Sequence, residues 1–532
     1  MSPSLLKQIL KIFKCPVYIV GGALRDSLLG KTVTDLDIAV ANKHALGKKA
    51  GELARRLNAS VFPLDAENLV YRIIAAPRNK AALPVRLRRT SGRNRPQKNK
   101  KAVRFQIDLA PFQGAGIIED LKKRDFTINS MAYSAEESGL KIKILISKGA
   151  LKITGIKKGK VIDPLNGMKD LATRRIRGCA WNMKQDPLRM LRAFRIASQS
   201  AFSVDKDTLR QISLHADRIR KTAPERIRDE IMMLLENPES HVYFKDLWKA
   251  GLLFKIIPEL QPALKCAEIY YGKGGALKHT FLVMERLEFL FKNLNRLFPK
   301  CNKIPYLKGN REILKFTALL HDIAKAPRAK IINGRLRFFG HESFGAEMSE
   351  KIMRRLRFSK EEIKFACRII CHHLRPGNLG HNRIISEKAV FRLFRDMGEE
   401  TIPLLLLCWA DYASYISRDT LETVKNKLKK PPIAIPAGGL PRTGLKKTLR
   451  FLQVINLLMN SYAEKGKYLY LKTAKIITGN DVMKILGIPE SPAIGEFLES
   501  LKMLQFEGKI QNRKQAIEFL KRLKRLKSSK PR

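Results

Sequence analysis

The chain has 532 residues, of which 45% are hydrophobic, and its 103 lysines and arginines against 49 aspartates and glutamates give a formal net charge of +54. This length predicts three or four domains. The charge predicts a polyanionic partner, for which a long nucleic acid fits best; the alternatives are that the charge serves solubility or binds a membrane surface. The sequence has no run of 18 apolar residues that could span a bilayer and no signal-peptide pattern at its start. Together with seven cysteines that lack paired spacing, this predicts a cytoplasmic protein.

The first motif lies near the start of the chain, where a β-branched and aromatic run over 18–20 is followed by Gly21 and Gly22. We predict that this run is a strand and that the glycines, which lack a Cβ, let backbone N–H groups approach a phosphate. Arg25 would supply a forked cation for the same anion, and Asp26 follows it directly. The segment indicates a nucleoside triphosphate site.

Asp35 and Asp37 alternate with apolar residues in the predicted strand 34–38, so that both side chains should point to the same face. Magnesium prefers hard oxygen ligands and is usually bound by one or two carboxylates together with substrate phosphates. Two such ions can activate an attacking hydroxyl and stabilise a leaving pyrophosphate. An edge strand with solvated aspartates is the alternative, but the preceding glycines, Arg25 and Asp26 favour the metal site.

A third carboxylate would complete a two-metal site, and Asp108 lies on another alternating, strand-like run over 104–109. A polar residue at the end of a strand is the alternative interpretation. The pattern also predicts a helix over 48–57 and a strand over 69–75. Short strands alternating with helices indicate a compact α/β unit at the start of the chain.

Composition and periodicity change along the chain. Segment 78–104 has eleven lysines and arginines and no acidic residue, and it is predicted to be a mobile basic loop. Contact with RNA phosphate and a solvated insertion explain this composition equally well. From about residue 170 the pattern becomes helical. The predicted domains are a catalytic head over 1–145 that contains the basic insertion 78–104, a helical neck over 146–265, a histidine- and aspartate-containing domain over 266–420, a linker over 421–445, and a helical tail over 446–532 with a basic end.

Several segments agree in order and spacing with one known family: GGALRD (21–26), DLD (35–37), EDLKKRDFTINSMA (119–132) and QDPLRMLRAFR (185–195). The chain resembles the bacterial-type, class II, tRNA nucleotidyltransferases and poly(A) polymerases of the polymerase-beta-like superfamily. In addition, ITGNDVM (477–483) resembles the tail element that grips the tRNA elbow, which favours tRNA over mRNA tails. The basic insertion is atypical of the family.

This resemblance implies an α+β fold, with a polymerase-beta-like α/β head followed by mostly α-helical neck, HD and tail domains. It also implies that Arg124 contacts the ribose or the phosphates of the incoming nucleotide. Asp125 and Asn129 belong to the same motif and are candidate nucleotide-binding residues.

The third motif resembles the helix with which the family selects C or A by hydrogen bonds, in place of a nucleic-acid template. Asp186 and Arg189 would read the base, and because they are one helical turn apart we expect them to share a face. Arg192 and Arg195 would support the nucleotide. Gln185 stands where most members of the family have glutamate.

A second metal site is predicted from histidines and aspartates whose order, H…HD…D, resembles that of the HD phosphohydrolase superfamily. Core histidines with satisfied nitrogens are the alternative interpretation. Such a site, with a divalent transition metal or Mg²⁺, could activate water against a phosphodiester, although the domain could equally be an inherited scaffold. The candidate ligands are His279, His321, Asp322 and Asp411, with His341 and His372 as two further ones.

The sequence thus leads to one main hypothesis, a template-independent enzyme that uses Mg²⁺, ATP and CTP to add CMP, AMP or both to the 3′ end of tRNA. A poly(A) polymerase is the nearest alternative. A metal-dependent phosphohydrolase acting on 2′,3′-cyclic phosphate ends and a catalytically silent RNA-binding protein are further alternatives. The choice between CCA, CC and A addition depends on loop and domain geometry that spacing does not reveal.

Overall fold

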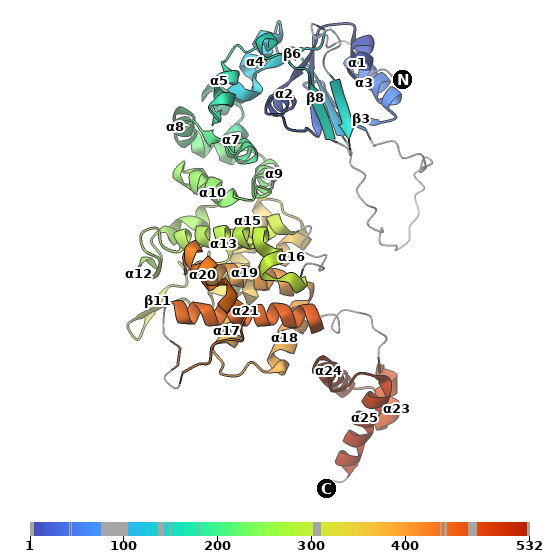
Figure 1. Ribbon diagram of the computed structural model, residues 1–532, viewed down its shortest axis with the longest axis vertical. Coiled ribbons are helices and arrows are strands. Elements are labelled where there is room, and N and C mark those ends of the chain that lie inside the picture. Colours follow the sequence, from blue (N-terminus) through green and yellow to red (C-terminus); the bar gives the residue numbers. More distant parts are fainter. Residues whose placement is uncertain are drawn as a thin grey trace. The chain divides into compact units, whose positions relative to one another are not determined.

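The computed structural model describes residues 5–41, 43, 45–75, 105–136, 143–147, 150–178, 180–301, 310–436, 439–440, 444–465 and 476–528. The predicted basic insertion 78–104 lies outside these residues, as do parts of the predicted linker. The chain forms two compact units, Met1–Thr222 and Ala223–Arg532 (Figure 1).

The first unit is built on a six-stranded mixed sheet with the order β3-β4-β5-β2-β1-β6. The central pair, β2 and β5, is parallel, and the other neighbouring pairs are antiparallel. The predicted strands over 18–20, 34–38, 69–75 and 104–109 are confirmed. The strands are β1 Val17–Val20, β2 Asp35–Val40, β3 Ser60–Asp65, β4 Val70–Ala75, β5 Phe105–Pro111 and β6 Ala132–Ser134.

Alternation decides the two faces of this sheet. Leu36 and Ile38 of β2 and Ile107 of β5 are almost fully buried, whereas Asp35 is exposed and Asp37 is half-buried. The predicted helix over 48–57 is confirmed as α3, which packs with α1 and against β3 and β4. The helices of this part are α1 Leu5–Phe13, α2 Gly21–Leu28, α3 Leu46–Leu57 and α4 Ile117–Lys123, followed by the 3-10 turn η1 Thr127–Asn129.

The remainder of the first unit is mainly helical, as its sequence predicts. Two small two-stranded sheets accompany the helices, one antiparallel (β7, β8) and one parallel (β9, β10). The elements are β7 Lys143–Ser147, β8 Ala150–Thr154, α5 Gly167–Ala172, β9 Arg175–Ile176, α6 Ala180–Gln185, α7 Leu188–Ser200, β10 Ser203–Val204 and α8 Lys206–His215.

The second unit is a helical assembly organised around α19. This helix is apolar on nearly all sides and is therefore buried, and it packs against α13, α14, α16 and α21. The elements are α9 Pro224–Leu235, α10 Ser240–Lys249, α11 Leu252–Ile256, α12 Glu268–Tyr271, α13 Gly275–Leu297, α14 Arg311–Leu320, β11 Lys330–Ile332, β12 Arg335–Arg337, α15 His341–Arg355, α16 Lys360–His372, α17 Arg375–Gly380, α18 Glu387–Met397, α19 Thr401–Ala413, α20 Arg418–Leu428, α21 Leu445–Lys465, α23 Gly479–Leu486, α24 Pro492–Phe506 and α25 Arg513–Ser528.

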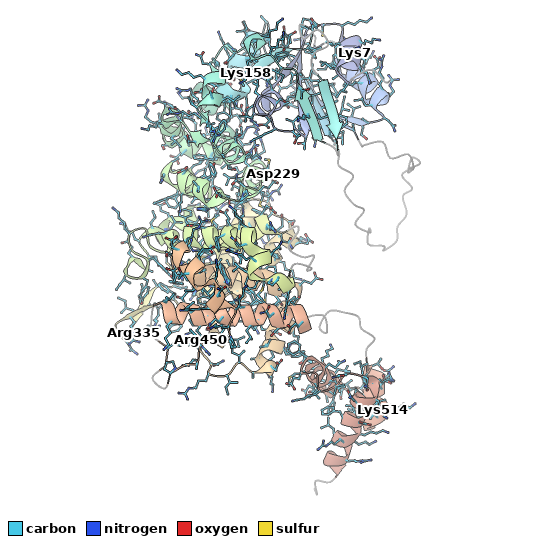
Figure 2. All side chains as sticks on the ribbon, viewed as in Figure 1. Lys7, Lys158, Asp229, Arg335, Arg450 and Lys514 are labelled. Carbon is cyan, nitrogen blue, oxygen red and sulfur yellow. The ribbon has the colours of Figure 1, made fainter. Side chains whose placement is uncertain are left out.

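A buried cation fixes the end of α17 to α21. The Arg450 side chain, on α21 (Figure 2), donates through Nε to the carbonyl of Gly380 at 2.8 Å and through Nη2 to that of Asn382 at 2.6 Å. Its Nη1 donates to the carbonyl of Ile433. Carbonyl groups therefore solvate this guanidinium in place of water, and burial lowers its pKa.

Candidate active site

Three carboxylates meet on one face of the central sheet. In the parallel pair β2–β5, Asp37 lies directly opposite Asp108, and Asp35 lies opposite Gln106. Neighbouring strands are about 4.8 Å apart, and residues two apart on a strand share a face. The structure therefore brings Asp35, Asp37 and Asp108 together, as their spacing predicts.

The electrostatics of this cluster favour a cation. Burial raises the pKa of Asp37 to about 6, and the charge of Asp108 adds to this effect. Burial and the Asp108 charge also raise the pKa of Asp35. Hard oxygen ligands that repel one another when ionised are the set that a divalent cation such as Mg²⁺ fits.

The two glycines place the start of α2 against these carboxylates. Gly21 has φ +64°, in the left-handed region, and a Cβ there would lie 3.0 Å from Asp37 Oδ2 and 3.2 Å from Arg124 Nη1. The backbone N–H of Ala23 donates to Asp37 Oδ2 at 3.2 Å. No side chain caps the first turn of α2, and the N–H groups of a helix N-terminus are suited to hold a phosphate.

Arg72 is a site residue that the sequence motifs did not indicate, and it lies on β4 opposite Asp108. Its Nε donates to Asp108 Oδ1 at 2.8 Å and its Nη2 to Oδ2 at 2.7 Å, a bidentate pair that fixes the plane of the carboxylate. The hydrogen bonds to Asp108 raise the pKa of Arg72. A lone arginine inside the apolar strand VYRIIA was the available signal.

Other predicted nucleotide-binding residues bind one another. Arg25 donates to both carboxylate oxygens of Asp26, each at 2.9 Å, and through Nη1 to Asn129 Oδ1 at 2.8 Å. The Asn129 amide then donates to Asp125 Oδ1 at 2.9 Å, and Arg192 donates to Asp125 Oδ2 at 2.9 and 3.1 Å. We call this series of hydrogen bonds, from α2 through η1 to α7, the polar relay.

Charge explains why an amide lies at the centre of the polar relay. Burial alone would raise the pKa of Asp125, but the charge of Arg192 and the hydrogen bonds from Asn129 and Arg192 lower it. Asn129 accepts from a cation on one side and donates to an anion on the other, a combination that an amide can make and a carboxylate cannot. The polar relay fixes α7 relative to α2 and the carboxylates.

Asp186 and Arg189 were predicted to lie on one helix, and the structure corrects this for Asp186, although the N–H of Arg189 donates to the Asp186 carbonyl at 3.0 Å and the two residues are one turn apart. α6 ends at Gln185 and α7 begins at Leu188, because Pro187 disfavours helical geometry at the residue before it. Asp186 therefore precedes α7 and accepts from the N–H of Leu188 at 3.2 Å, while Arg189, in the first turn, donates to the carbonyl of Lys123 at 3.3 Å.

The more distant predicted residue on α7 makes a local contact. Arg195 donates to Gln199 one turn further along the helix, at 2.9 Å. Of the two predicted base-reading residues, Asp186 therefore lies just before α7 and Arg189 in its first turn beside α4, and Arg195 lies further along the helix.

The second predicted cluster also forms, from α13, α15, α19, the C-terminal end of α16 and the turn after α14. Candidate ligand atoms of His279, His321 and Asp411 lie within 4.8 Å of one another, and so do those of Asp322, His341 and His373. Six buried polar atoms here face one another at ion-pair distances instead of making regular hydrogen bonds: His279 Nε2 lies 3.1 Å from Asp411 Oδ1 and 3.3 Å from Asp322 Oδ2. A bound cation would hold such a converging set of nitrogen and oxygen atoms. The six atoms are Nε2 of His279, His321 and His341, both carboxylate oxygens of Asp322, and Oδ1 of Asp411.

The structure corrects one candidate ligand, because His373 and not His372 joins this cluster. α16 ends at His372, which is half-buried, and burial with the charges of Arg375 and Arg368 lowers its pKa. His373 is 3% exposed, and its Nδ1 lies 2.6 Å from the carbonyl of Ile370, which leaves Nε2 facing Asp322 at 3.8 Å. Burial lowers the pKa of His373 to about 4, so the imidazole is neutral and suited to bind a metal.

Asp322 is the electrostatic centre of the cluster. Burial would raise its pKa, but the charges of His321 and Lys325 and hydrogen bonds from His279 and His321 hold it well below its usual range. The Lys325 ammonium lies 2.5 Å from Asp322 Oδ2. Asp322 is therefore anionic and faces histidine nitrogens, the donor set of a divalent transition metal.

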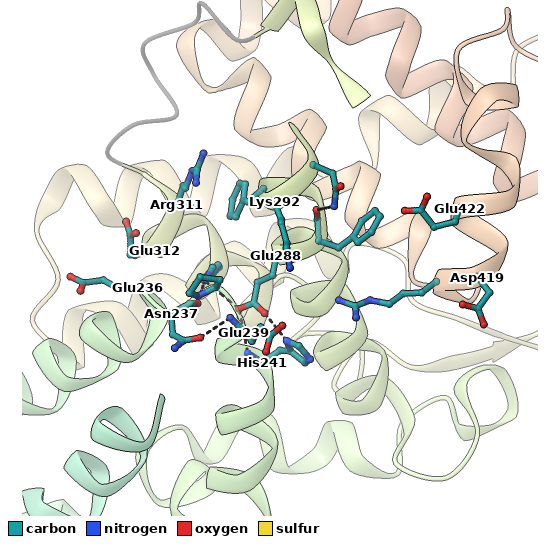
Figure 3. Close-up of a pocket in the computed structure, with 16 residues that line it drawn as sticks. Glu236, Asn237, Glu239, His241, Glu288, Lys292, Arg311, Glu312, Asp419 and Glu422 are labelled. Atoms are coloured by element: carbon teal, nitrogen blue, oxygen red, sulfur yellow. Dashed lines mark hydrogen bonds and ion pairs between the residues drawn. The ribbon is translucent and has the colours of Figure 1, made fainter. Parts of the chain in front are cut away.

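A third buried ionic group lies beside a pocket of about 770 Å³, and its members hydrogen-bond to one another (Figure 3). Glu288 lies 2.6 Å from His241 Nδ1 and 3.2 Å from Lys315 Nζ. Lys315 also donates to the carbonyls of Leu235 and Asn237, at 2.7 and 2.6 Å. Because these groups satisfy one another, the group ties α10, α13 and α14 together and is structural.

Three family descriptions match the chain. "Poly A polymerase head domain" matches residues 17–177, "Probable RNA and SrmB- binding site of polymerase A" residues 201–264, and "HD domain" residues 276–416. Together they cover both the carboxylate cluster and the histidine cluster.

The curated relatives are tRNA-processing proteins. The CC-adding tRNA nucleotidyltransferase of Thermus thermophilus is 26% identical over 94% of this chain and 92% of its own length. The A-adding tRNA nucleotidyltransferase of Deinococcus radiodurans is 25% identical over 95% and 94%. The Multifunctional CCA protein of Ralstonia nicotianae is 28% identical over 74% of this chain and 81% of its own length.

Solved structures share the fold. The Thermotoga maritima CCA-adding enzyme complexed with tRNA matches with a TM-score of 0.57 and 19% identity over 97% of this chain and 93% of that chain. A CCA-adding enzyme in complex with CTP matches with a TM-score of 0.58 and 19% identity, over 97% and 92%. Among the described residues, none of the helices has the length and apolar character to cross a bilayer.

Proposed function

Because this chain belongs to the tRNA nucleotidyltransferase and poly(A) polymerase family, and carries both its head and an HD domain, we propose that it adds CMP, AMP or both to the 3′ end of tRNA. The observation that carries the proposal is the convergence of Asp35, Asp37 and Asp108 beside the N-terminus of α2. Carboxylates next to a phosphate-binding helix end are what metal-assisted transfer to a hydroxyl requires.

In this proposal the head residues have separate tasks. Asp35 and Asp37 hold magnesium, which when bound would neutralise charge on the triphosphate and favour ionisation of the tRNA 3′-hydroxyl. Asp108, oriented by Arg72, accepts a hydrogen bond from that hydroxyl. The first N–H groups of α2 and the Arg124 guanidinium hold the phosphates, and Asp186 with Arg189 contacts the base.

The decisive experiment uses three tRNA transcripts that end before CCA, after C and after CC. Each is incubated with the protein, magnesium and CTP, ATP or both, and products are resolved at single-nucleotide length. Four curated relatives that align over nearly the whole chain are CC-adding or A-adding enzymes, so we expect addition of only C residues or only A. Addition of all three nucleotides would replace this expectation by a full CCA activity, and unlimited A tails on an unstructured oligonucleotide would favour a poly(A) polymerase. No extension of any transcript would refute the proposal.

A second activity is favoured by the HD cluster, in which buried histidine nitrogens and carboxylate oxygens converge. We propose that His279, His321, Asp411, Asp322, His341 and His373 hold one or two divalent ions, which would activate water against a phosphodiester. Metal analysis after dialysis, with release of phosphate from a 2′,3′-cyclic phosphate end as the activity assay, tests this role. A metal-free protein that also fails to bind added Mn²⁺, Ni²⁺ or Mg²⁺ would refute it.

Replacing Asn129 by alanine should lower kcat/KM for nucleotide addition about 10- to 100-fold, because hydrogen bonds to charged groups contribute roughly 1.5–3 kcal/mol each. Breaking the polar relay frees α7 to rotate, so we also expect weaker discrimination between CTP and UTP. The matched control is Ser130→Ala, which removes a buried hydroxyl bonded to the carbonyl of Phe126 but leaves the relay intact. Equal effects of the two substitutions, measured by steady-state kinetics, would contradict the assignment.

A further inference from the structure

Exposed apolar side chains gather at one edge of the second unit. They come from α12, from the hairpin β11–β12 and from the turn that leads to α15. We call these two segments, 265–278 and 328–340, the hairpin surface. The exposed fractions are 82% for Ile269, 51% for Tyr270, 77% for Ile331 and 71% for Phe339.

The hairpin surface is strongly basic. Its lysine and arginine side chains are exposed, and none of them forms an ion pair with a carboxylate among the described residues. Glu268 is the acidic residue within the two segments, and its carboxylate accepts from the N–H of Gly274 at 3.0 Å. The cations are Lys265, Lys273, Lys278, Arg328, Lys330, Arg335 and Arg337.

Direct contacts join the two segments to each other. The Tyr270 hydroxyl donates to the carbonyl of Leu336 at 3.0 Å, which holds α12 against the hairpin. Figure 2 shows Arg335 at the outer edge of this unit. The exposed residues of α12 and those of the hairpin therefore lie on elements that contact each other.

The inner edge of the hairpin surface is the HD cluster. The ring of Tyr271, next to Tyr270 in the chain, stacks on His279 with centroids 4.5 Å apart and planes at 16°. On the other side Phe338 meets the His341 ring edge-on, with centroids 6.5 Å apart. Two candidate metal ligands, His279 and His341, therefore contact rings that adjoin the hairpin surface.

We propose that the hairpin surface binds single-stranded RNA and guides a terminal phosphate to the HD cluster. Unpaired cations attract the phosphate backbone, and exposed aromatic rings stack on bases without demanding a particular sequence. An anionic membrane would bind the cations equally well. It would not explain why this surface adjoins a cluster that is suited to phosphodiester chemistry. Binding stands by itself, whereas guidance to the cluster rests on the proposed hydrolytic activity.

The test measures binding of a fluorescein-labelled, unstructured 12-nucleotide RNA to the full-length protein by fluorescence anisotropy over a range of salt concentrations. The double variant Arg335→Glu, Arg337→Glu should weaken binding about tenfold or more and flatten its salt dependence, because two phosphate contacts are lost. Tyr270→Ala with Phe339→Ala should weaken binding with little change in the salt dependence.

The control for charge is Lys364→Glu with Lys388→Glu. These exposed lysines lie on α16 and α18, which Figure 1 shows on the other side of this unit from α12 and β11. This variant carries the same change in net charge and should reduce affinity less than threefold. Equal losses in the two charge variants, or unchanged RNA binding in the hairpin variant, would overturn the proposal. So would a hairpin variant that stops binding phosphatidylserine vesicles but still binds RNA.

If the surface binds RNA, the Arg335→Glu, Arg337→Glu variant should also release phosphate from a cyclic-phosphate RNA end with a raised KM and an unchanged kcat. A small substrate, 2′,3′-cyclic AMP, does not reach the hairpin and should be hydrolysed as by the wild-type protein. Loss of binding without any hydrolysis by wild-type protein would leave the surface established and refute only the hydrolytic role.

Discussion

Replacing Asp37 by asparagine should reduce nucleotide addition at least ~1,000-fold while tRNA affinity changes less than about threefold, since the substitution removes a charge that acts on the metal-bound triphosphate and not on the RNA. The side chain keeps its size and can still accept from the N–H of Ala23. Primer extension and tRNA binding by filter retention separate the two effects. Asp207→Asn, at an exposed site in the same unit, serves as the control. Parallel losses of addition and tRNA affinity would assign Asp37 to RNA binding.

The pH dependence gives a second readout for the same residue. Burial raises the pKa of Asp37 to about 6, so the metal-free carboxylate is protonated below that pH and ionised above it. Protons then compete with magnesium, and the apparent magnesium affinity should fall by up to about tenfold for each pH unit below 6. Above pH 7 it should be constant. Magnesium titrations of activity between pH 5 and 8 measure this dependence.

Asp322→Asn should lower the free energy of unfolding of the metal-free protein by about 3–5 kcal/mol, the usual cost of leaving one partner of a buried ion pair alone. The lone partner is the Lys325 ammonium, whose pKa burial would lower and the Asp322 charge raises. Adding Lys325→Met should recover most of the loss. Urea denaturation in the presence of a chelator measures all three proteins. A single variant as stable as wild type would show that the ammonium finds another partner or solvent.

The direction of the pKa shift fixes how this stabilisation varies with pH. Because Asp322 has a pKa well below its usual range in the folded protein, its ionisation stabilises the fold at all pH values above the unfolded-state pKa, about 3.9. This contribution is lost as the pH falls through the lower folded-state pKa. The wild-type protein should therefore lose its advantage over Asp322→Asn on acidification below about pH 4.

The elements that sequence predicted well are those in which local periodicity decides the result. The alternation of Asp35, Leu36 and Asp37 predicts a strand with one polar face, and β2 has that face. By contrast, the choice between His372 and His373 depends on the residue at which α16 ends, and helix ends vary by one or two residues.

Two further differences have equally local causes. Asp186 was expected on a helix, but Pro187 separates α6 from α7. Arg72 could not be assigned to Asp108, because their pairing follows from the register of β4 against β5, which no short motif encodes. Sequence therefore identified most of the chemical groups of both sites, and the structure added His373 and the partner Arg72, which orients Asp108.

The polar relay implies a reciprocal relation between the two ends of the nucleotide site. Arg25 lies on the helix whose backbone binds Asp37, and Arg192 lies on α7, whose first turn carries Arg189, one of the two residues proposed to contact the base. If a base that fits α7 favours the arrangement in which magnesium binds most tightly, then magnesium must increase the affinity for that base by the same factor. The correct nucleotide would thus increase the magnesium affinity of the site at which it reacts, whereas a mismatched nucleotide would leave the magnesium affinity unchanged.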